Sequence, residues 1–245
     1  LAALPGAGVA IVGGDDPRAA AQLLGSPAST WLRYGEDDAN AVALVARSLD
    51  GFRGQHLTVR VLGRAPRPLL EIDVAMLGRA GVHAALGAIA IAEAILPGGA
   101  PAGDAITRAL GGGAAREPGR LTPRDAALGF TVVDDAYNAN PASMIASLEA
   151  TREIARAEGR PLVLVLGEMF ELGARAEVLH DEVGKAAALA SPRAILAVSG
   201  KASHYHPMAK RYAVPCERPA DADPAAQAAR QLAIAGAVGL VEAPQ

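Results

Sequence analysis

The chain has 245 residues, of which 51% are hydrophobic, 3% aromatic and 20% charged, and its formal net charge is −3 at pH 7. This length suits one large domain or two of ordinary size, and the composition is typical of a globular α/β protein rather than a disordered one. The slightly negative charge offers no basic field for phosphate contacts and argues against nucleic-acid binding. The single cysteine, Cys216, excludes an internal disulfide, and no Cys/His cluster indicates structural zinc, so we expect a reducing, cytoplasmic compartment.

The first half of the chain predicts a mixture of strands and helices. A short buried strand is expected at Gly8–Val12, before the Asp15–Pro17 turn. The elements expected next are a short helix at Arg18–Leu24, an antiparallel pair of strands at His56–Gly63 and Pro68–Met76 joined by an Arg64–Pro66 turn, an apolar helix at Val82–Pro97 and a helix at Gly103–Leu110. The apolar helix has only about three-quarters of the roughly 20 residues that a membrane span needs, and Glu93 interrupts it. We therefore expect a buried helix and no membrane association.

A domain boundary is predicted at Gly111–Gly113, which is followed by a polar stretch up to Pro118-Gly119. We place the domains at residues 1–115 and 116–245. The expected elements of the second domain are strands at Phe130–Val133, Pro161–Leu166, Ala194–Val198 and Val238–Val241, and helices at Ala142–Ala157, Glu177–Leu189 and Ala225–Ile234. This alternation predicts βαβ units and a mostly parallel sheet, in which ligands bind beyond the carboxyl ends of the strands.

The stretch DDAYNANPASM, residues 134–144, lies at one of these carboxyl ends. Asn140 and Pro141 fit the start of a helix, because asparagine caps well and proline is tolerated in the first turn. A cap needs only one oxygen, however, and the turn supplies many more polar groups. The side chains that a cap leaves unexplained are Asp134, Asp135, Tyr137 and Asn138. Carboxylates and amides near a helix start suit a nucleotide ribose or a polar substrate.

A second strand-end loop, GEMFELG at residues 167–173, contains Glu168 and Glu171. The segment can be explained either as a functional site or as an ordinary loop. In an ordinary loop the glycines would allow the turn, Met169 and Phe170 would pack in the core, and Glu171 would face solvent.

Other candidate groups are weaker. His204 and His206 form an HxH pair without a third metal ligand, so we expect a solvated loop there. Arg120 suits a phosphate or carboxylate fork, or an ordinary surface position. Both Gly-Lys pairs, at residues 184–185 and 200–201, lack the following hydroxyl and the upstream glycine of a phosphate-binding loop. The chain therefore contains no complete phosphate cradle.

Taken together, the motifs DDAYNANPASM, GEMFELG and LHDEVG strongly resemble the C-terminal domain of the Mur ligase family. Upstream, GVAIVGGDDP, the segment Gly81–His83 before its apolar helix, and Gly119-Arg120 resemble further family motifs in the same order. The resemblance implies an α/β chain that comprises the C-terminal portion of a Mur ligase central ATPase domain (residues 1–115) and a Rossmann-like Mur ligase C-terminal domain (residues 116–245). It also implies that the chain is a fragment of a longer protein.

The resemblance further implies an ATP-dependent and Mg²⁺-dependent amide ligase of peptidoglycan precursor synthesis. Such an enzyme joins D-alanyl-D-alanine to UDP-N-acetylmuramoyl-tripeptide through an acyl phosphate, acts in the cytoplasm and is a monomer. The residues that match nucleotide-binding positions are His83, Arg120, Asp135 and Asn138. The residues that match the substrate cleft are Asp134, Tyr137, Asn140 and Glu168. No metal ligand is implied within this chain, and we expect the isolated chain to be inactive.

Departures from the family pattern leave two alternatives open. Asparagines of the pattern are replaced by Gly13, Ala84 and Gly87, and its C-terminal lysine and glycine are replaced by Glu242 and Ala243. The first alternative is a Mur-ligase-like binding subunit that has lost catalysis. The second is a sister ligase that adds a different amino acid.

Overall fold

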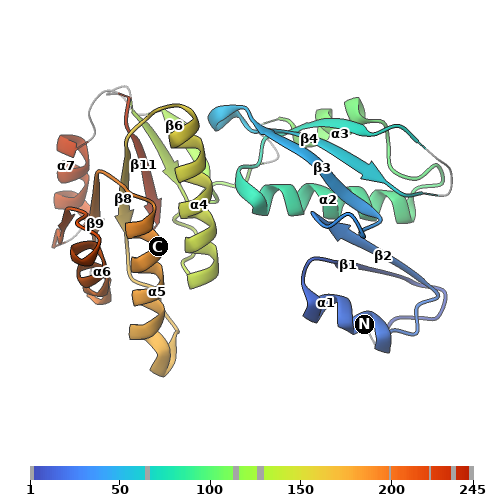
Figure 1. Cartoon of the computed structure of the whole chain (residues 1–245), viewed down its shortest axis with the longest axis horizontal. Helices are drawn as coiled ribbons and strands as arrows, with labels where there is room; N and C mark the ends of the chain where they lie inside the picture. The colour runs from blue at the N-terminus through green and yellow to red at the C-terminus, as the bar shows by residue number, and fades with distance from the viewer. Residues whose placement is uncertain are drawn as a thin grey trace. The chain divides into compact units, whose positions relative to one another are not determined.

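The computed structural model describes residues 3–63, 67–112, 116–125, 130–198, 200–220, 222–232 and 236–242. The chain divides into two compact units, unit 1 at Leu1–Ala115 and unit 2 at Arg116–Gln245. Each unit is a sheet covered by helices (Figure 1), as expected of an α/β protein.

Unit 1 contains a five-stranded sheet with the order β1-β2-β3-β4-β5. Its elements are β1 (Val9–Gly13), α1 (Pro17–Ala21), η1 (Gln22–Gly25), β2 (Thr30–Gly35), β3 (Val42–Leu49), η2 (Gly51–Arg53), β4 (Gln55–Val61), β5 (Leu70–Val74), α2 (Gly78–Ile95) and α3 (Gly103–Leu110). Strands β1, β2 and β3 pair in parallel, whereas β4 pairs antiparallel with both β3 and β5. The sheet is therefore half parallel and half antiparallel.

The core of unit 1 lies between this sheet and α2. Buried residues recur along α2 at helical spacing, as Val82, Leu86 and Ile89, and they meet alternate residues of β4 such as Leu57 and Val59. Of the helices in the described ranges, only α2 has a length and composition that would suit a membrane span, and 44% of it is buried within the unit. A helix that packs one face on a sheet can have the same length and composition as a membrane span. The packing of α2 on the sheet agrees with the buried helix that the sequence predicts.

Several predictions for unit 1 are confirmed. Strands β1, β4 and β5 form where expected, β4 and β5 are antiparallel, and α3 matches its predicted range. The predicted Arg64–Pro66 turn lies outside the described residues. Strands β2 and β3 were not predicted, and α2 begins earlier than expected, at Gly78. The start was missed because glycines 78 and 81 look like loop residues, although Gly81 is needed there: a Cβ would lie 2.7 Å from Cβ of Met76.

Unit 2 contains a six-stranded sheet with the order β10-β9-β8-β11-β7-β6. Its elements are β6 (Thr122–Asp125), β7 (Thr131–Asp134), α4 (Pro141–Ala157), β8 (Leu162–Leu166), η4 (Gly173–Arg175), α5 (Ala176–Leu189), β9 (Ala194–Ala197), η5 (Lys201–His204), α6 (Tyr205–Arg211), β10 (Cys216–Glu217), α7 (Ala222–Leu232) and β11 (Val238–Glu242). Apart from the antiparallel edge strand β6, all of these strands pair in parallel. This confirms the predicted parallel sheet.

The helices of unit 2 cover both faces of its sheet. Helices α4, α5 and α6 connect strands that step across the sheet in one direction, from β7 to β8, β9 and β10, whereas α7 leads back from β10 to β11. Because parallel crossovers are right-handed, α7 lies on the opposite face from the other three. Its packing against β8 and β9 agrees with this arrangement. The connection through α7 places β11 between β8 and β7, so the carboxyl ends of these three strands are adjacent.

One prediction for unit 2 is wrong. The expected solvated loop around His204 and His206 is instead the junction of η5 and α6, and Tyr205 between the two histidines is fully buried. The Tyr205 hydroxyl donates to the carbonyl of Gly167 at 2.8 Å, which ties α6 to the end of β8. Strands β6 and β10 were also missed, because each is short and lies at an edge of the sheet.

Candidate functional site

The candidate site in unit 2 is centred on the turn between β7 and α4. Asn140 caps α4 as expected: its Oδ1 accepts from the backbone N–H of Ser143 at 3.0 Å, and the Ser143 hydroxyl accepts from Asn140 N at 3.2 Å. Pro141 occupies the first helical position, where no N–H is needed. The structural role predicted for these two residues is confirmed.

Asp135 links three segments of the site. Its Oδ1 accepts from the backbone N–H of Leu121 at 2.8 Å, and its Oδ2 accepts from the hydroxyl of Ser147 on α4. The neighbouring Asp134 forms an ion pair with Arg124 of β6 at 3.1 Å and accepts from Ala136 N at 3.3 Å. Both carboxylates thus hold the turn against the segments on either side of it.

Glu242 lies beside Asp135, at the carboxyl end of β11. It is 1% exposed, and its Oε2 has no hydrogen-bond partner among the described residues. Burial raises the pKa of Glu242 well above its ordinary value, and the hydrogen bond to Asp135 and that residue's charge raise it further, whereas the Ser147 hydroxyl acts in the opposite direction. The buried Glu242 carboxyl therefore favours its protonated, neutral form more strongly than an exposed glutamate does.

Arg120 and Tyr137 form the exposed part of the site. The Arg120 guanidinium carbon lies 4.3 Å from the centroid of the Tyr137 ring, and its Nε lies 3.0 Å from Glu117 Oε2. The segments that carry the two side chains are joined by a hydrogen bond from Tyr137 N to Gly119 O at 3.1 Å. Gly119 has a φ of +74°, which favours glycine at this position. The stack therefore presents a cation and an aromatic face to solvent beside Asp135.

The remaining predicted residues of unit 2 lie at the same edge of the sheet. Asn138 is exposed, and its Oδ1 accepts from Ala139 N at 2.9 Å. Glu168 is half-buried at the end of β8, where its charge contributes to the raised pKa of Tyr205, whose main cause is burial. In the same loop, Met169 is buried as the structural explanation requires, whereas Phe170 is 56% exposed.

His83 belongs to a separate cluster in unit 1, beyond the carboxyl ends of β1 and β2. Its Nε2 lies 3.7 Å from both Asp15 Oδ2 and Glu36 Oε1. Burial of Asp15 alone would raise its pKa, but hydrogen bonds from the backbone of Glu36 and Asp37 and from the Asn40 amide outweigh this, so the pKa is lowered. Asp15 is therefore an ionised acceptor that holds the β2–β3 loop, with His83 at its rim.

Tyr34 lies against Gly13 and Gly87, two of the positions at which the sequence has glycine where the family pattern has asparagine. A Cβ added to Gly87 would lie 3.3 Å from the Tyr34 Cζ, and one added to Gly13 would lie 3.9 Å from the same atom. An asparagine at residue 87 would press against this ring. The two glycines and Tyr34 therefore form one packed arrangement in unit 1.

Neither unit offers a ready metal centre in its described residues: no group of three or more His, Cys, Asp or Glu side chains is placed to hold an ion.

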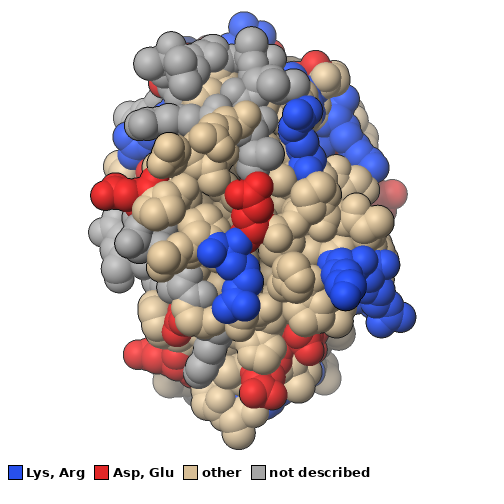
Figure 2. Space-filling model, turned by 90° about the vertical axis from the view of Figure 1, so that its left-hand side faces the viewer, with Lys and Arg blue, Asp and Glu red and all other residues tan. Residues whose placement is uncertain are grey.

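On the face drawn in Figure 2, Lys and Arg side chains are interspersed with Asp and Glu rather than forming one basic surface. Ser147 and Glu242 are partners of Asp135 that the sequence did not predict. Ser147 carried a weak signal, because it lies two helical turns after Asn140.

Comparison with known proteins identifies the family. The family model described as "Mur ligase, glutamate ligase domain" matches residues 119–243, just over half of the chain. The UDP-N-acetylmuramoyl-tripeptide–D-alanyl-D-alanine ligase of Escherichia coli is 37% identical over 141 residues, which cover 58% of this chain and 29% of that protein.

Solved structures agree in fold over nearly the whole chain. A crystal structure of MurF from Acinetobacter baumannii has a TM-score of 0.78 at 23% identity and covers 98% of this chain and 49% of its own. MurF from Thermotoga maritima, in complex with ADP, has a TM-score of 0.70 at 17% identity, with coverages of 96% and 49%. The chain thus spans at most about half the length of these proteins. With the family model matched across unit 2 and this fold shared across both units, the chain belongs to the Mur ligase family.

Proposed function

We propose that this chain is part of an ATP-dependent ligase that joins D-alanyl-D-alanine to UDP-N-acetylmuramoyl-tripeptide during cytoplasmic peptidoglycan precursor synthesis. The activity and both substrates are those named for the Escherichia coli relative. Because the chain spans only part of that protein, the whole activity is a proposal for the protein that contains this chain.

The observation that best supports the proposal is the Arg120–Tyr137 stack beside Asp135. The guanidinium is exposed and is held by the Tyr137 ring and by the ion pair of its Nε with Glu117, so its two terminal amino groups face an anionic ligand from an ordered side chain. In the proposed reaction the developing charge lies on a transferring phosphoryl group, which needs such a fixed cation. Asp135, in contrast, has both oxygens engaged within unit 2, so it positions the Leu121 segment that follows Arg120.

We assign the other residues to the same proposed reaction. We assign Asn138 and His83 to nucleotide binding, since each presents an exposed or half-exposed polar side chain beyond strand ends of its own unit. The residues proposed to line the substrate cleft are Asp134, Tyr137, Asn140 and Glu168. Of these, Asp134 and Asn140 already have intramolecular partners, so they would shape the cleft rather than bind strongly.

The residues of the chain suit a nucleotide better than a metal ion. Arg120 is suited to the anionic groups of a nucleotide and His83 to its ring, and ATP would supply the phosphoryl group that activates the carboxylate of the tripeptide. The described residues contain no group of three or more His, Cys, Asp or Glu side chains placed to hold a metal ion, so we assign no Mg²⁺ ligand to this chain. We therefore derive no step through Mg²⁺ from this chain.

A test uses the full protein that carries this chain, with ATP, UDP-N-acetylmuramoyl-tripeptide and D-alanyl-D-alanine. We expect phosphate release that depends on the dipeptide, and a fall in kcat/KM of about 100-fold for Arg120→Gln, as when a single charge-stabilising donor is removed. Arg211→Gln, at an exposed position at the end of α6, is a matched control that removes the same charge away from the turn.

Two outcomes would contradict the proposal. Turnover with a single amino acid but not with D-alanyl-D-alanine would identify a sister ligase instead. Binding of the precursor without any ATP-dependent turnover would identify a binding subunit that has lost catalysis. The isolated 245-residue chain is expected to show no turnover.

A further inference from the structure

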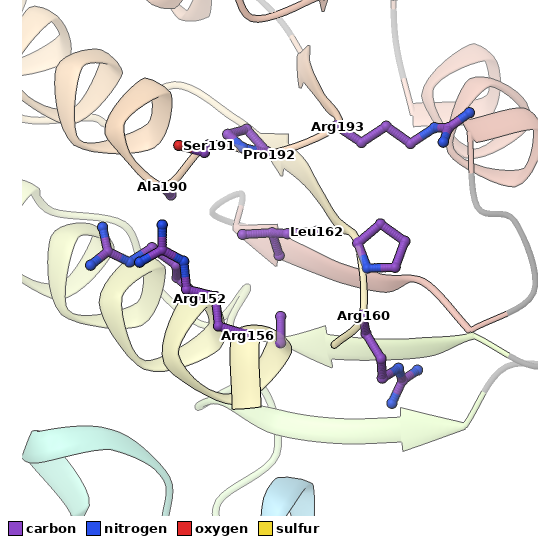
Figure 3. Close-up of a pocket in the computed structure, with 10 residues that line it drawn as sticks. Arg152, Arg156, Arg160, Leu162, Ala190, Ser191, Pro192 and Arg193 are labelled. Atoms are coloured by element: carbon purple, nitrogen blue, oxygen red, sulfur yellow. The ribbon is translucent and has the colours of Figure 1, made fainter. Parts of the chain in front are cut away.

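A cavity lined by arginines lies at the amino ends of the strands of unit 2. It has a volume of about 290 Å³ and is formed where α4 ends, β8 begins and the α5–β9 loop turns (Figure 3). The charged residues that line it are Arg152, Arg156, Arg160 and Arg193. Among the described residues that line it, none is acidic. This concentration of like charge calls for an explanation.

Two of the four arginines have structural roles. Arg160 donates to the carbonyls of Gly236 at 2.6 Å and Ala237 at 2.9 Å and forms an ion pair with Glu158 at 3.0 Å, so it fastens the loop before β8 to the loop before β11. Arg152 donates to the carbonyl of Leu189 at 3.3 Å, at the carboxyl end of α5. A cation is favourable there, because the last carbonyls of a helix carry negative partial charge.

The other two arginines have no such role. Among the described residues, the side chains of Arg156 and Arg193 have neither a hydrogen-bond nor an ion-pair partner, and both residues are exposed. Arg156 lies one turn after Arg152 on α4, and the two side chains extend next to each other near Ala190 (Figure 3). Like charges at this spacing repel each other. Arg193, on the loop before β9, lines the same cavity from another segment of the chain.

The walls of the cavity are fixed before any ligand arrives. Arg193 N donates to Leu162 O at 2.7 Å, and Arg160 N donates to Ala155 O at 2.8 Å, so both loops are fastened to their neighbours. Pro192 is buried, and the Ser191 hydroxyl provides one further polar group in the lining. A ligand would therefore have to order only the arginine side chains.

We propose that this cavity binds a ligand of the pyrophosphate class, that is, a small anion with two adjacent phosphoryl groups. Guanidinium groups match phosphate oxygens in a two-pronged geometry, and several of them around one cavity suit more than one phosphoryl group. The volume is at the lower end of the range for ligand pockets, which fits a pyrophosphate moiety better than an entire nucleotide.

This site is distinct from the turn at residues 134–144. Strand β8 runs from the cavity at Leu162 to the opposite edge of the sheet at Leu166. At about 3.3 Å per residue, the two edges are roughly 13 Å apart, so one small anion cannot touch both. The proposal therefore does not rest on the ligase activity.

The test is calorimetric titration of the 245-residue chain with inorganic pyrophosphate at low, constant ionic strength. We expect one saturable site per chain, and at least about tenfold weaker binding for the double variant Arg156→Gln/Arg193→Gln. The matched control is Arg175→Gln/Arg211→Gln, which removes the same charge from exposed positions of unit 2 that do not line the cavity. Circular dichroism of each variant establishes that it is folded.

Any of the following results would overturn the proposal. The first is affinity that falls equally in the control variant, since that would reflect general charge. The second is unchanged affinity in the cavity variant, or binding that is lost in Arg120→Gln, which would move the anion to the turn. The third is orthophosphate binding as tightly as pyrophosphate, because a single phosphoryl group should engage fewer arginines and bind at least about tenfold more weakly.

Discussion

The two edges of the sheet in unit 2 use their charged side chains differently. At the carboxyl edge, Asp134 and Asp135 are engaged in ion pairs or hydrogen bonds, and Glu242 is buried against Asp135. At the amino edge, only Arg160 is fully engaged, whereas Arg156 and Arg193 are exposed without partners in the described part of the chain. The comparison shows that charge density alone does not identify a binding site: the engaged groups support structure, and the unengaged ones remain available to a ligand.

The largest effect is expected where an arginine of the amino edge is structural. Replacing Arg160 with Ala leaves the carbonyls of Gly236 and Ala237 and the Thr131 hydroxyl without their donor. We expect the unfolding free energy to fall by about 3 kcal/mol, measured by urea denaturation followed by circular dichroism. Arg160→Lys should recover only part of the loss, since an ammonium group cannot form the same fork. If Arg160→Ala lowers the unfolding free energy by less than about 1 kcal/mol, Arg160 is no more structural than Arg156 or Arg193.

The second effect concerns the buried carboxyl pair of the opposite edge. Because the folded-state pKa of Glu242 is raised, its protonated form stabilises the fold below its unfolded value near 4.5, and this stability is lost as pH rises through the raised value. The slope should approach about −1.4 kcal/mol per pH unit within that window. Glu242→Gln, which cannot ionise, should flatten the slope in urea denaturation measured from pH 5 to pH 8. An unchanged slope would mean that another group causes it.

A smaller effect is expected at the cap of α4. Asn140→Ala removes the acceptor for Ser143 N and should lower the unfolding free energy by about 1 kcal/mol. Asn140→Asp retains an acceptor oxygen and should stay close to the wild type. If Asn140→Ala has no effect on stability, the residue serves only the proposed substrate cleft.

The smallest effect is expected for the unengaged arginines. Arg156→Gln should change the unfolding free energy by less than about 0.5 kcal/mol, because the side chain has no partner among the described residues and repels Arg152. The same denaturation experiment measures this. A large destabilisation would show that the amino edge is structural throughout, and the contrast between the edges would disappear.

The sequence predicted most of unit 2 because its elements have simple local signatures. Continuous apolar runs such as Leu162–Leu166 are too short for a core helix and contain β-branched residues, which favours buried strands, and the helix beginning at Asn140-Pro141 has a clear capping signal. Prediction failed where burial comes from distant partners. The segment at residues 203–207 looks polar, yet Tyr205 is buried because its hydroxyl reaches Gly167 and its ring lies 5.7 Å from that of His180.

The sequence by itself determined the motifs, and with them the family and the location of the candidate site at residues 134–144. Those motifs are local, so their residues lie close together in any fold of the chain. Only the tertiary structure decided which charges are free. Asp135 is engaged through Leu121 and Ser147, and Glu242 reaches it from the last strand. The arginines at residues 152 to 193 meet because β9 lies beside β8, and the pairing of strands separated by a whole helix is decided by the packing of the sheet rather than by local sequence.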